Sequence, residues 1–415
     1  MLAPLRNRDF ALLWAGMTIS LVGDGIYFVA IAWEALSLSN TAGALASVGV
    51  AWTLPTVACL LLGGTLSDRL ERRHLMLWAT VAQALAIGTI GVLAAAGALE
   101  LWELVCLVAL YGAAQAFFLP AFEAIVPTLV RVDELAHASA VDQFVRPLSV
   151  QLAGPAVGGV LVAVTGPGVA FLVDAATFLV AACALLAMRA TSQLTTPASG
   201  RSPLAGLGDA LRFVRANPWL ARTLVAAGVT LLVFLGPYQV LLPFVVKNVL
   251  HAGSGTLGAI RALGGLGALT AALTIGQGGL PGRFISAMFA AWALQSLALA
   301  GYALATGTWA FACIALLSGA CGAVGNVIWG TLMKTRVPNE LLGRVASLDW
   351  LVSIGLTPVS FALTGPAAHA FGARATLLAA GLIATITLLG FLVTPSLRAT
   401  ERVAWKQPLG QGSHG

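Results

Sequence analysis

Several charged side chains lie inside long apolar stretches of the sequence, and four of them are singled out first: Asp24, Asp142, Arg146 and Arg261. A charge at the centre of a membrane span costs roughly 2.5–3.5 kcal/mol on insertion scales, so each of these residues needs a reason to be there. A carboxyl group can exchange a proton, and a guanidinium group can bind an anion or hold a carboxylate. These four residues are therefore the first candidates for chemistry.

Asp24 is the candidate for proton exchange. It follows the start of its apolar stretch by about 14 residues, or roughly 21 Å at a helical rise of 1.5 Å per residue. The carboxyl group would then lie in the middle to outer part of a bilayer. If it faces a cavity there, it can carry a proton. A structural hydrogen bond to a neighbouring helix explains the residue equally well.

Arg261 lies nearer the midplane of its stretch. It could hold an anionic group of a substrate, tune a carboxylate across a cavity, or form an ion pair within its own half of the chain. Asp142 and Arg146 are four residues apart and therefore share one face of a helix. We expect a local salt bridge between them, which could also serve as a gate.

For other polar and aromatic residues in the apolar stretches, the sequence indicates only a general location or a candidate role. Glu34 and Asp349 stand near the ends of their stretches, which is typical of solvated boundaries, and the role of Asp174 stays open. Trp33 and Phe118 are candidates for lining a substrate cavity, although tryptophan also marks the membrane interface.

The elements that hold these residues must be membrane helices. The 415 residues are 59% hydrophobic and 9% charged, with a mean hydropathy of +0.92. A soluble domain has about 25% charged residues, so a soluble globular enzyme is excluded. The five cysteines fall in apolar runs without a CxxC pair, which favours buried free thiols over disulfides or a zinc site.

Twelve stretches are long enough to cross a bilayer, which needs about 20 apolar residues per helix. The first contains Asp24 and has no small-residue cleavage site after it, so we interpret it as a retained helix. The predicted spans are 10–38, 43–67, 75–97, 101–128, 138–165, 168–188, 219–247, 252–277, 284–305, 308–333, 344–370 and 373–394. We expect tight turns outside the bilayer at two joints, Gly166-Pro167-Gly168 and Gly372-Ala373.

The positive charges predict the orientation. All but four of the 22 Lys and Arg residues would face the cytoplasm if both termini do. The exceptions are Lys247 and Arg374 in outer loops, and Arg146 and Arg261 within spans. This is the positive-inside pattern, so the net charge of +6 reflects topology and does not indicate nucleic-acid binding. We predict an integral plasma (inner) membrane protein with both termini cytoplasmic.

The polar segment 189–218 divides the spans into two groups of six. We predict an all-α membrane protein of twelve transmembrane helices in two pseudo-symmetric six-helix halves, residues 1–188 and 219–394. Segment 189–218 would be a cytoplasmic linker with a short interfacial helix, and 395–415 a disordered tail. The Gly-Pro pairs at 154–155 and 365–366 are part of a weak internal repeat that supports duplication.

Residues 64–73 read Gly64-Thr-Leu-Ser-Asp68-Arg69-Leu-Glu-Arg72-Arg73. They resemble the loop signature of the major facilitator superfamily, except that Glu71 replaces its second glycine. The resemblance implies a conformational latch, formed by Gly64, Asp68, Arg69, Arg72 and Arg73. Glu123 could reach Arg72 or Arg73. The alternative is that these arginines only fix the orientation of the chain.

The fifth span contains Gly154-Pro155-Ala-Val-Gly158-Gly159. This resembles the core of the antiporter signature of the same superfamily. Pro155 removes a backbone donor and kinks the helix, and glycines four residues apart allow another helix to approach closely. Ordinary small-residue packing is the alternative.

The order of motifs along nearly the whole chain resembles the drug and siderophore exporter branch of the superfamily, which contains macrolide exporters and the enterobactin exporter. The resemblance implies a secondary active transporter that exports an amphipathic or drug-like molecule by proton antiport with alternating access. Its partners would be a small molecule, protons and the lipid bilayer, with no nucleic acid, and the protein would be a monomer.

Catalytic motifs and a P-loop are absent from the sequence, so we expect no enzyme, no cofactor and no metal site. An uptake carrier or lipid flippase of the same fold, or a receptor or scaffold that transports nothing, remain as alternatives.

Overall fold

The computed structural model describes residues 6–131, 134–189, 203–278 and 281–394, and its regular elements there are all helical. Twelve helical segments are long and apolar enough to cross a membrane, which confirms the predicted number of spans. The predicted tail 395–415 and residues 190–202 of the predicted linker lie outside the described residues.

The spans are built from the following helices, in which η marks a π-helical segment. The first six use α1 (Arg8–Leu38), α2 (Ala42–Arg69), α3 (Arg72–Ala95), α4 (Leu101–Leu129), α5 (Leu135–Pro147) with η3 (Leu148–Ala153) and α6 (Gly154–Thr165), and α7 (Pro167–Ala187). A short helix, α8 (Pro203–Ala216), follows. The last six use α9 (Pro218–Gly236) with η4 (Pro237–Leu241) and α10 (Leu242–Asn248), α11 (Ser254–Gly278), α12 (Phe284–Leu304), α13 (Thr308–Arg336), α14 (Asn339–Gly355) with α15 (Thr357–Phe371), and α16 (Ala373–Leu392).

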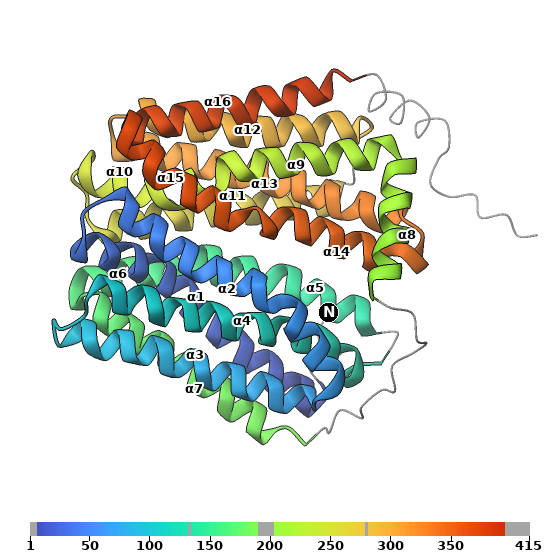
Figure 1. Ribbon diagram of the computed structural model, residues 1–415, viewed down its shortest axis with the longest axis horizontal. Helices are drawn as coiled ribbons and strands as arrows, with labels where there is room; N and C mark the ends of the chain where they lie inside the picture. The colour runs from blue at the N-terminus through green and yellow to red at the C-terminus, as the bar shows by residue number, and fades with distance from the viewer. Residues whose placement is uncertain (1–5, 132–133, 190–202, 279–280, 395–415) are drawn as a thin grey trace, which may run out of the picture.

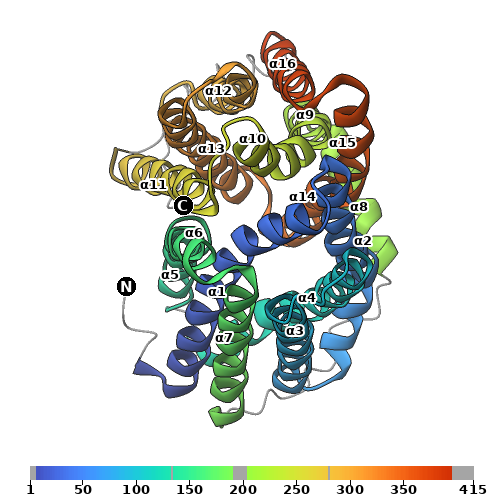
Figure 2. The same ribbon diagram turned by 90° about the vertical axis from the view of Figure 1, so that its left-hand side faces the viewer.

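The helices run between two ends of the molecule (Figure 1). We call the end that carries α8, on the right of Figure 1, the linker end, and the opposite end, with the turns after α1 and α6, the far end. Helices α1–α7 gather on one side and α9–α16 on the other. Seen from the far end, α6 lies beside α11 and α2 beside α15 (Figure 2), and these pairs make the main contacts between the two sides.

Two tight turns at the far end depend on glycine. Gly166 joins α6 to α7 with a φ of 85°, and Gly372 joins α15 to α16 with a φ of 83°. Residues with a Cβ rarely adopt this conformation. These are the two joints that the sequence predicts as tight turns, and the matching positions fit the weak internal repeat.

Proline explains the irregular spans. Pro155 follows η3, and Pro237 begins η4. Proline has no N–H to donate to the preceding turn, and a wider π turn accommodates such a break. The fifth span is therefore a helix with a π segment in the turns before Pro155, which is more specific than the simple kink predicted.

Three hydrophobic clusters hold the helices together. One of them joins the two sides of the molecule, and the other two each lie within one side. One cluster combines residues of both sides, from Ile26 to Ala380, and includes Val245 and Phe361 near the far end. The second draws only on residues 210–388 and the third only on residues 10–188. The two sides thus share a core toward the far end and have separate cores toward the linker end.

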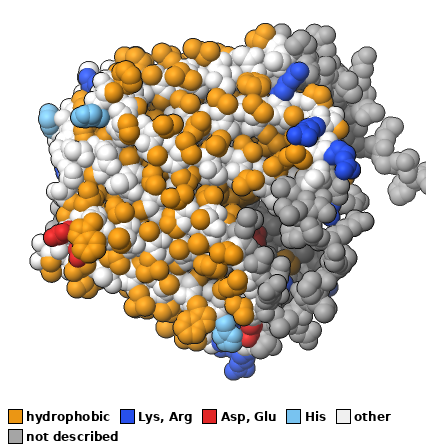
Figure 3. All heavy atoms as spheres, in the orientation of Figure 1, with side chains coloured by type: hydrophobic (Ala, Val, Ile, Leu, Met, Phe, Trp, Pro, Cys, Tyr) orange, Lys and Arg blue, Asp and Glu red, His pale blue; other side chains and the backbone are white. Residues whose placement is uncertain are grey.

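The outer surface is largely apolar, as a bilayer requires (Figure 3). Large side chains such as Trp78, with 71% of its surface exposed, and Trp309, with 84%, stand on it. The cysteines are free, as predicted, but Cys106, Cys183 and Cys313 are exposed, so their expected burial was wrong. An apolar run does not imply burial in a membrane protein, because lipid accepts apolar side chains as readily as a core does.

Candidate functional site

Asp24 belongs to a polar cluster inside the first half of the chain. Its Oδ1 accepts a hydrogen bond of 2.9 Å from the hydroxyl of Tyr111 on α4. Asp174 on α7 lies within electrostatic range of Asp24 and is fully buried. The two carboxyl groups are brought together because Gly23 has no side chain, and a methyl group there would collide with Asp174 and Thr177.

Asp174 is only partly satisfied by its neighbours. Its Oδ1 accepts a long hydrogen bond of 3.3 Å from the Thr177 hydroxyl, while Oδ2 is buried and makes no hydrogen bond within the described part of the chain. A buried polar atom without a partner is costly and needs an explanation. An acid pair held in this way is suited to binding a proton.

A small pocket lies beside Asp24, and its lining reaches toward the linker end. It has a volume of about 50 Å³, which is enough for water. Asp24 and Phe118 line it, as do Ser20, Thr80, Gln83, Gln115 and Arg146, and the wall continues to Leu185 near the end of α7. The predicted residues Asp24 and Phe118 therefore line the same pocket, together with several other polar side chains and a larger number of apolar ones.

Asp142 and Arg146 form the expected ion pair, with 3.1 Å between Asp142 Oδ1 and Arg146 Nη2. Both side chains are partly exposed, and pairs of this kind contribute only about 0–1 kcal/mol. Arg146 also acts electrostatically on Asp24. Its guanidinium group thus pairs with Asp142 and lies within electrostatic range of Asp24.

A second polar cluster lies in the other half, around Arg261 on α11. Arg261 Nη2 donates a hydrogen bond of 3.2 Å to Gln239 Oε1 in η4. Tyr238 and Tyr302 lie within electrostatic range of the guanidinium group. Arg261 Nε and the Tyr302 hydroxyl are buried and make no hydrogen bond among the described residues.

Sequence reasoning missed the tyrosines of both clusters. The chain has only four, and Tyr27 and Tyr111 lie in the first cluster while Tyr238 and Tyr302 lie in the second. A tyrosine far from the membrane interface needs a partner for its hydroxyl. The rarity of this residue type was thus an available signal.

The glycines of the fifth span allow close contacts with two helices, α11 on the other side and α1 on the same side. A Cβ at Gly159 would lie 2.9 Å from the Cα of Gly258 on α11, and one at Gly158 would lie 2.8 Å from the Cα of Ile26 on α1. Gly154 packs in the same way against Gly25, next to Asp24. The predicted close packing is present, and it joins the halves at the far end.

We expect Gly258→Ala to separate the two sides at the far end. The new methyl group would collide with the Pro155 carbonyl and Gly159. Overpacking of this kind costs about 1–3 kcal/mol, enough to change the population of the closed far end by about tenfold or more. The rate at which a thiol reagent labels Asn248→Cys should rise accordingly, and transport should fall.

Gly276→Ala is the matched control, because it lies on the same helix and its Cβ would meet nothing within 4 Å. Equal labelling rates in Gly258→Ala and Gly276→Ala would contradict the importance of this contact.

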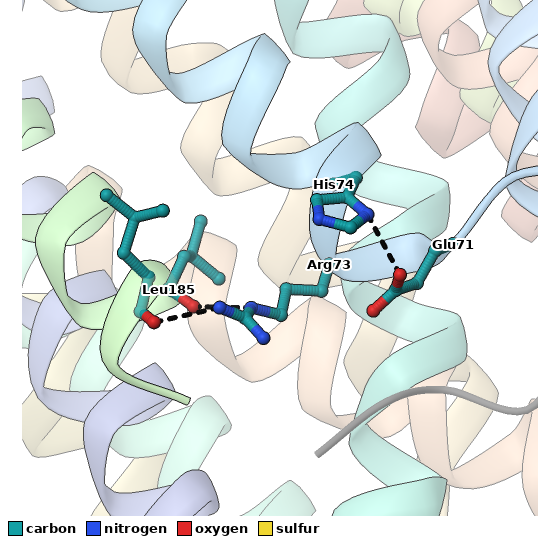
Figure 4. Close-up of polar contacts among 5 residues, drawn as sticks. Glu71, Arg73, His74 and Leu185 are labelled. Carbon is teal, nitrogen blue, oxygen red and sulfur yellow. Dashed lines mark hydrogen bonds and ion pairs between the residues drawn. The ribbon is translucent and has the colours of Figure 1, made fainter. Parts of the chain in front are cut away.

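The loop after α2 is anchored within the first half (Figure 4). Arg73 donates two hydrogen bonds to the last turn of α7, from Nε to the Leu185 carbonyl at 2.7 Å and from Nη2 to the Leu186 carbonyl at 2.8 Å. A cation at a helix C-terminus also interacts favourably with the helix dipole. Glu71, which replaces the glycine of the signature, begins α3 and pairs with His74 at 2.8 Å.

The remaining latch residues are placed less completely. Arg72 Nη1 donates to the Ala124 carbonyl on α4 at 2.9 Å. Glu123 forms no ion pair with Arg72 or Arg73 among the described residues and instead lies within electrostatic range of Asp142 and Arg146. Gly64, Asp68 and Arg69 lie near the end of α2, and their side chains are outside the described part of the chain. The latch role stays a prediction.

We expect Arg73→Ala to insert normally and to transport slowly. The substitution removes both bonds to the end of α7, whereas membrane insertion depends on the apolar spans. Asp68→Asn should behave similarly if the loop is a latch. The amount of protein in the membrane and the transport rate would be measured together, with His74→Ala as the control. Loss of Arg73→Ala from the membrane would contradict this assignment.

Polar contacts also join the two halves at the far end. Asn40 and Asn248 exchange hydrogen bonds of 2.6 Å and 3.1 Å, and Lys247 Nζ donates to the Leu36 carbonyl at 2.7 Å. Lys247 also lies 5.5 Å from the ring centre of Trp33. Lys247 is therefore part of helix α10 and not of an outer loop. The substrate role predicted for Trp33 stays untested, and its visible role is in this contact.

Glu34 differs from its prediction. Only 7% of its surface is exposed, and its carboxylate accepts a hydrogen bond from the Ser37 hydroxyl. Lys247 lies within electrostatic range of it. The contacts at the far end enclose this end of α1. Glu34 is therefore buried although it lies near the end of its span.

Comparisons with known proteins bear on these features. The family described as transmembrane secretion effector matches residues 1–409. The multidrug efflux pump Tap of Mycolicibacterium fortuitum is 29% identical, over 96% of this chain and 97% of that protein. The enterobactin exporter EntS of Citrobacter koseri is 28% identical, over 97% of this chain and 95% of that protein.

Among solved structures, a bacterial homologue of the iron transporter ferroportin in the inward-facing state has the same fold. It superimposes with a TM-score of 0.68 and 18% identity, over 94% of this chain and 99% of that one. Identity at this level supports the fold and nothing further.

Proposed function

Because this chain belongs to the transmembrane secretion effector family of the major facilitator superfamily, we propose that it exports an amphipathic, drug-like or siderophore-like small molecule in exchange for protons. Its relatives are named as efflux pumps and exporters. It is an integral membrane transporter and not an enzyme. In this proposal it acts as a monomer in the inner membrane, and the linker end faces the cytoplasm.

The carboxyl pair of Asp24 and Asp174 carries the proposal of proton exchange. Both side chains lie inside the spans, and the described residues supply them with hydroxyl donors, Tyr111 and Thr177, in place of a direct ion pair. Ionisable groups inside a membrane are costly and are typical of proton relays. Asp24 is the better carrier of the two, because it lines the pocket whereas Asp174 is fully buried.

We propose that the pocket beside Asp24 gives the proton its route, along the polar side chains in its lining. It runs from Asp24 past Gln83 and Gln115, which are joined by a hydrogen bond of 3.1 Å, toward the end of α7. Arg146 stands in its wall and holds Asp142. Protonation of Asp24 would weaken its attraction for Arg146, which would connect the proton to the arrangement of the fifth span.

The difference between the two ends supports our proposal of alternating access. The halves share hydrophobic and polar contacts at the far end and have separate cores at the linker end. We infer that this structure is the state closed at the far end. Export would require these contacts to open and others to form between the two halves at the linker end.

Transport by purified protein in proteoliposomes tests this function. The vesicles would contain phenylnaphthylamine, a neutral amphipathic fluorophore, and the membrane potential would be held at zero. We expect an imposed pH gradient to drive movement of the fluorophore, and a protonophore to abolish it. Movement that ignores the pH gradient would favour a facilitator, and binding without movement would favour a receptor.

A further inference from the structure

We propose that Arg261 and its neighbours form a subsite for the anionic group of the exported molecule, so that the substrates are amphipathic molecules with a carboxylate, sulfonate or phenolate beside aromatic rings. This inference rests on the proposed function, because it assumes that a small molecule enters the space between the halves. It assigns the substrate's charge to one half and the proton to the other.

The first observation is that Arg261 has no carboxylate partner among the described residues. Its one side-chain hydrogen bond goes to the neutral amide oxygen of Gln239. A buried cation without an opposite charge carries a large desolvation cost. An anionic group of a bound substrate would supply the missing counter-charge and offset this cost.

The second observation is that the second half has almost no acid to offer. Between residues 219 and 394 the only acidic residues in the sequence are Glu340 and Asp349, both on α14. Asp349 accepts a hydrogen bond of 3.1 Å from Trp329. The side chains that act electrostatically on Arg261 are the phenols of Tyr238 and Tyr302, which are neutral near pH 7. They supply no negative charge to balance the guanidinium group.

The third observation is a set of unused donors around the guanidinium group. Arg261 Nε and the Tyr302 hydroxyl are both buried and make no hydrogen bond within the described residues. A guanidinium group binds carboxylate or sulfonate oxygens through more than one N–H. Nε, a terminal nitrogen and the tyrosine hydroxyl together could donate to a single anionic group.

Aromatic rings stand beside these donors. Tyr238 stacks on Phe234 with 5.6 Å between ring centres, and Tyr302 packs against Phe311 at 5.0 Å. Rings with a polar edge suit ligands that are apolar at one end and charged at the other. Arg261 lies roughly two helical turns below the start of α11, beneath the closed far end. A ligand held there would be released when that end opens.

The test compares two fluorophores that differ by one charged group. Anilinonaphthalene sulfonate carries a sulfonate on the ring system of phenylnaphthylamine. Binding of each to the full-length protein in nanodiscs would be measured by fluorescence, after subtraction of empty nanodiscs. We expect the wild type to prefer the sulfonate, and Arg261→Gln to weaken sulfonate binding about tenfold or more. Binding of phenylnaphthylamine should stay within about twofold.

Two further variants and a stability measurement test whether Arg261→Gln loses sulfonate binding because an anion site is lost or because the structure is damaged. Arg261→Lys keeps the charge without the fork of donors and should be intermediate. Arg374→Gln makes the same substitution in the same half of the chain, at an arginine that donates a hydrogen bond to the Ala305 carbonyl. This variant should bind both fluorophores like the wild type. Removal of an unpartnered buried cation should raise the melting temperature of Arg261→Gln, whereas loss of a structural residue would lower it.

The inference is overturned if the wild type has no preference for the sulfonate, if Arg261→Gln binds it normally, or if the affinities for both fluorophores fall equally. Transport distinguishes this failure from failure of the proposed function. If phenylnaphthylamine export driven by a pH gradient persists in Arg261→Gln while sulfonate binding is unchanged, only the anion subsite is wrong. If the sulfonate depends on Arg261 but transport ignores the pH gradient, the subsite stands and antiport is wrong.

Discussion

Asp24→Asn is expected to abolish uphill export driven by a pH gradient while the protein still folds and binds substrate. The amide has the shape of the acid and can still accept the hydrogen bond from Tyr111, but it cannot release a proton. One pH unit is worth about 1.4 kcal/mol per proton, which sustains about a tenfold substrate gradient for a one-proton exchange. In the variant this gradient should fall to about one, with downhill movement retained.

Accumulation of phenylnaphthylamine at several imposed pH gradients, with the membrane potential held at zero, would measure this effect. Asp9→Asn is a suitable control, since it makes the same change at the start of α1, where Asp9 accepts a hydrogen bond from the Arg189 main chain. If Asp24→Asn still sustains the full gradient, Asp24 does not carry the proton, and the same test would then be applied to Asp174→Asn.

Linking residues 40 and 248 by a short thiol cross-linker should stop transport completely and reversibly. Asn40 and Asn248 come from opposite halves and are hydrogen-bonded at the far end. If the far end must open to release substrate, a covalent link there holds the protein in one state. The experiment uses Asn40→Cys with Asn248→Cys, after replacement of the five native cysteines, and a reductant that cleaves the link should restore transport.

The controls separate closure of the far end from chemical damage. Each single-cysteine variant should tolerate the reagent. A link between Ala305→Cys and Arg374→Cys, which joins neighbouring positions of one half at the same end, should leave transport active. Full transport by the protein linked at residues 40 and 248 would show that substrate does not leave between the halves at the far end. Alternating access by opening of the far end would then be refuted.

The membrane class and the number of spans could be predicted from the sequence. A bilayer imposes a length and an apolar composition on each helix, and both are properties of a single stretch of chain. The tight turns at Gly166 and Gly372 were predicted correctly for the same reason, because a turn depends on neighbouring residues. The ion pair between Asp142 and Arg146 also depends on residues close together in the sequence, four positions apart. The loop signature at 64–73 indicated the family for the same reason, because a motif is contiguous.

Partnerships between helices required the tertiary structure. Asp24 meets Tyr111 and Asp174 from two other helices, and Arg261 meets Gln239, Tyr238 and Tyr302 from two more. The burial of Glu34 and the exposure of Cys106, Cys183 and Cys313 were likewise beyond the apolar pattern. An apolar stretch faces lipid and protein with similar residues, so hydropathy cannot tell which side of a membrane helix is inside.

The sequence by itself therefore determined that this chain crosses a membrane through twelve helices and which of its residues are costly there, because those costs depend on each residue and its immediate neighbours. The tertiary structure alone decided that, among the described residues, Asp24 has an acidic neighbour while Arg261 has none. That difference depends on distances between helices far apart in the chain, and it is what assigns the proton to one half and an anionic substrate group to the other in our proposal.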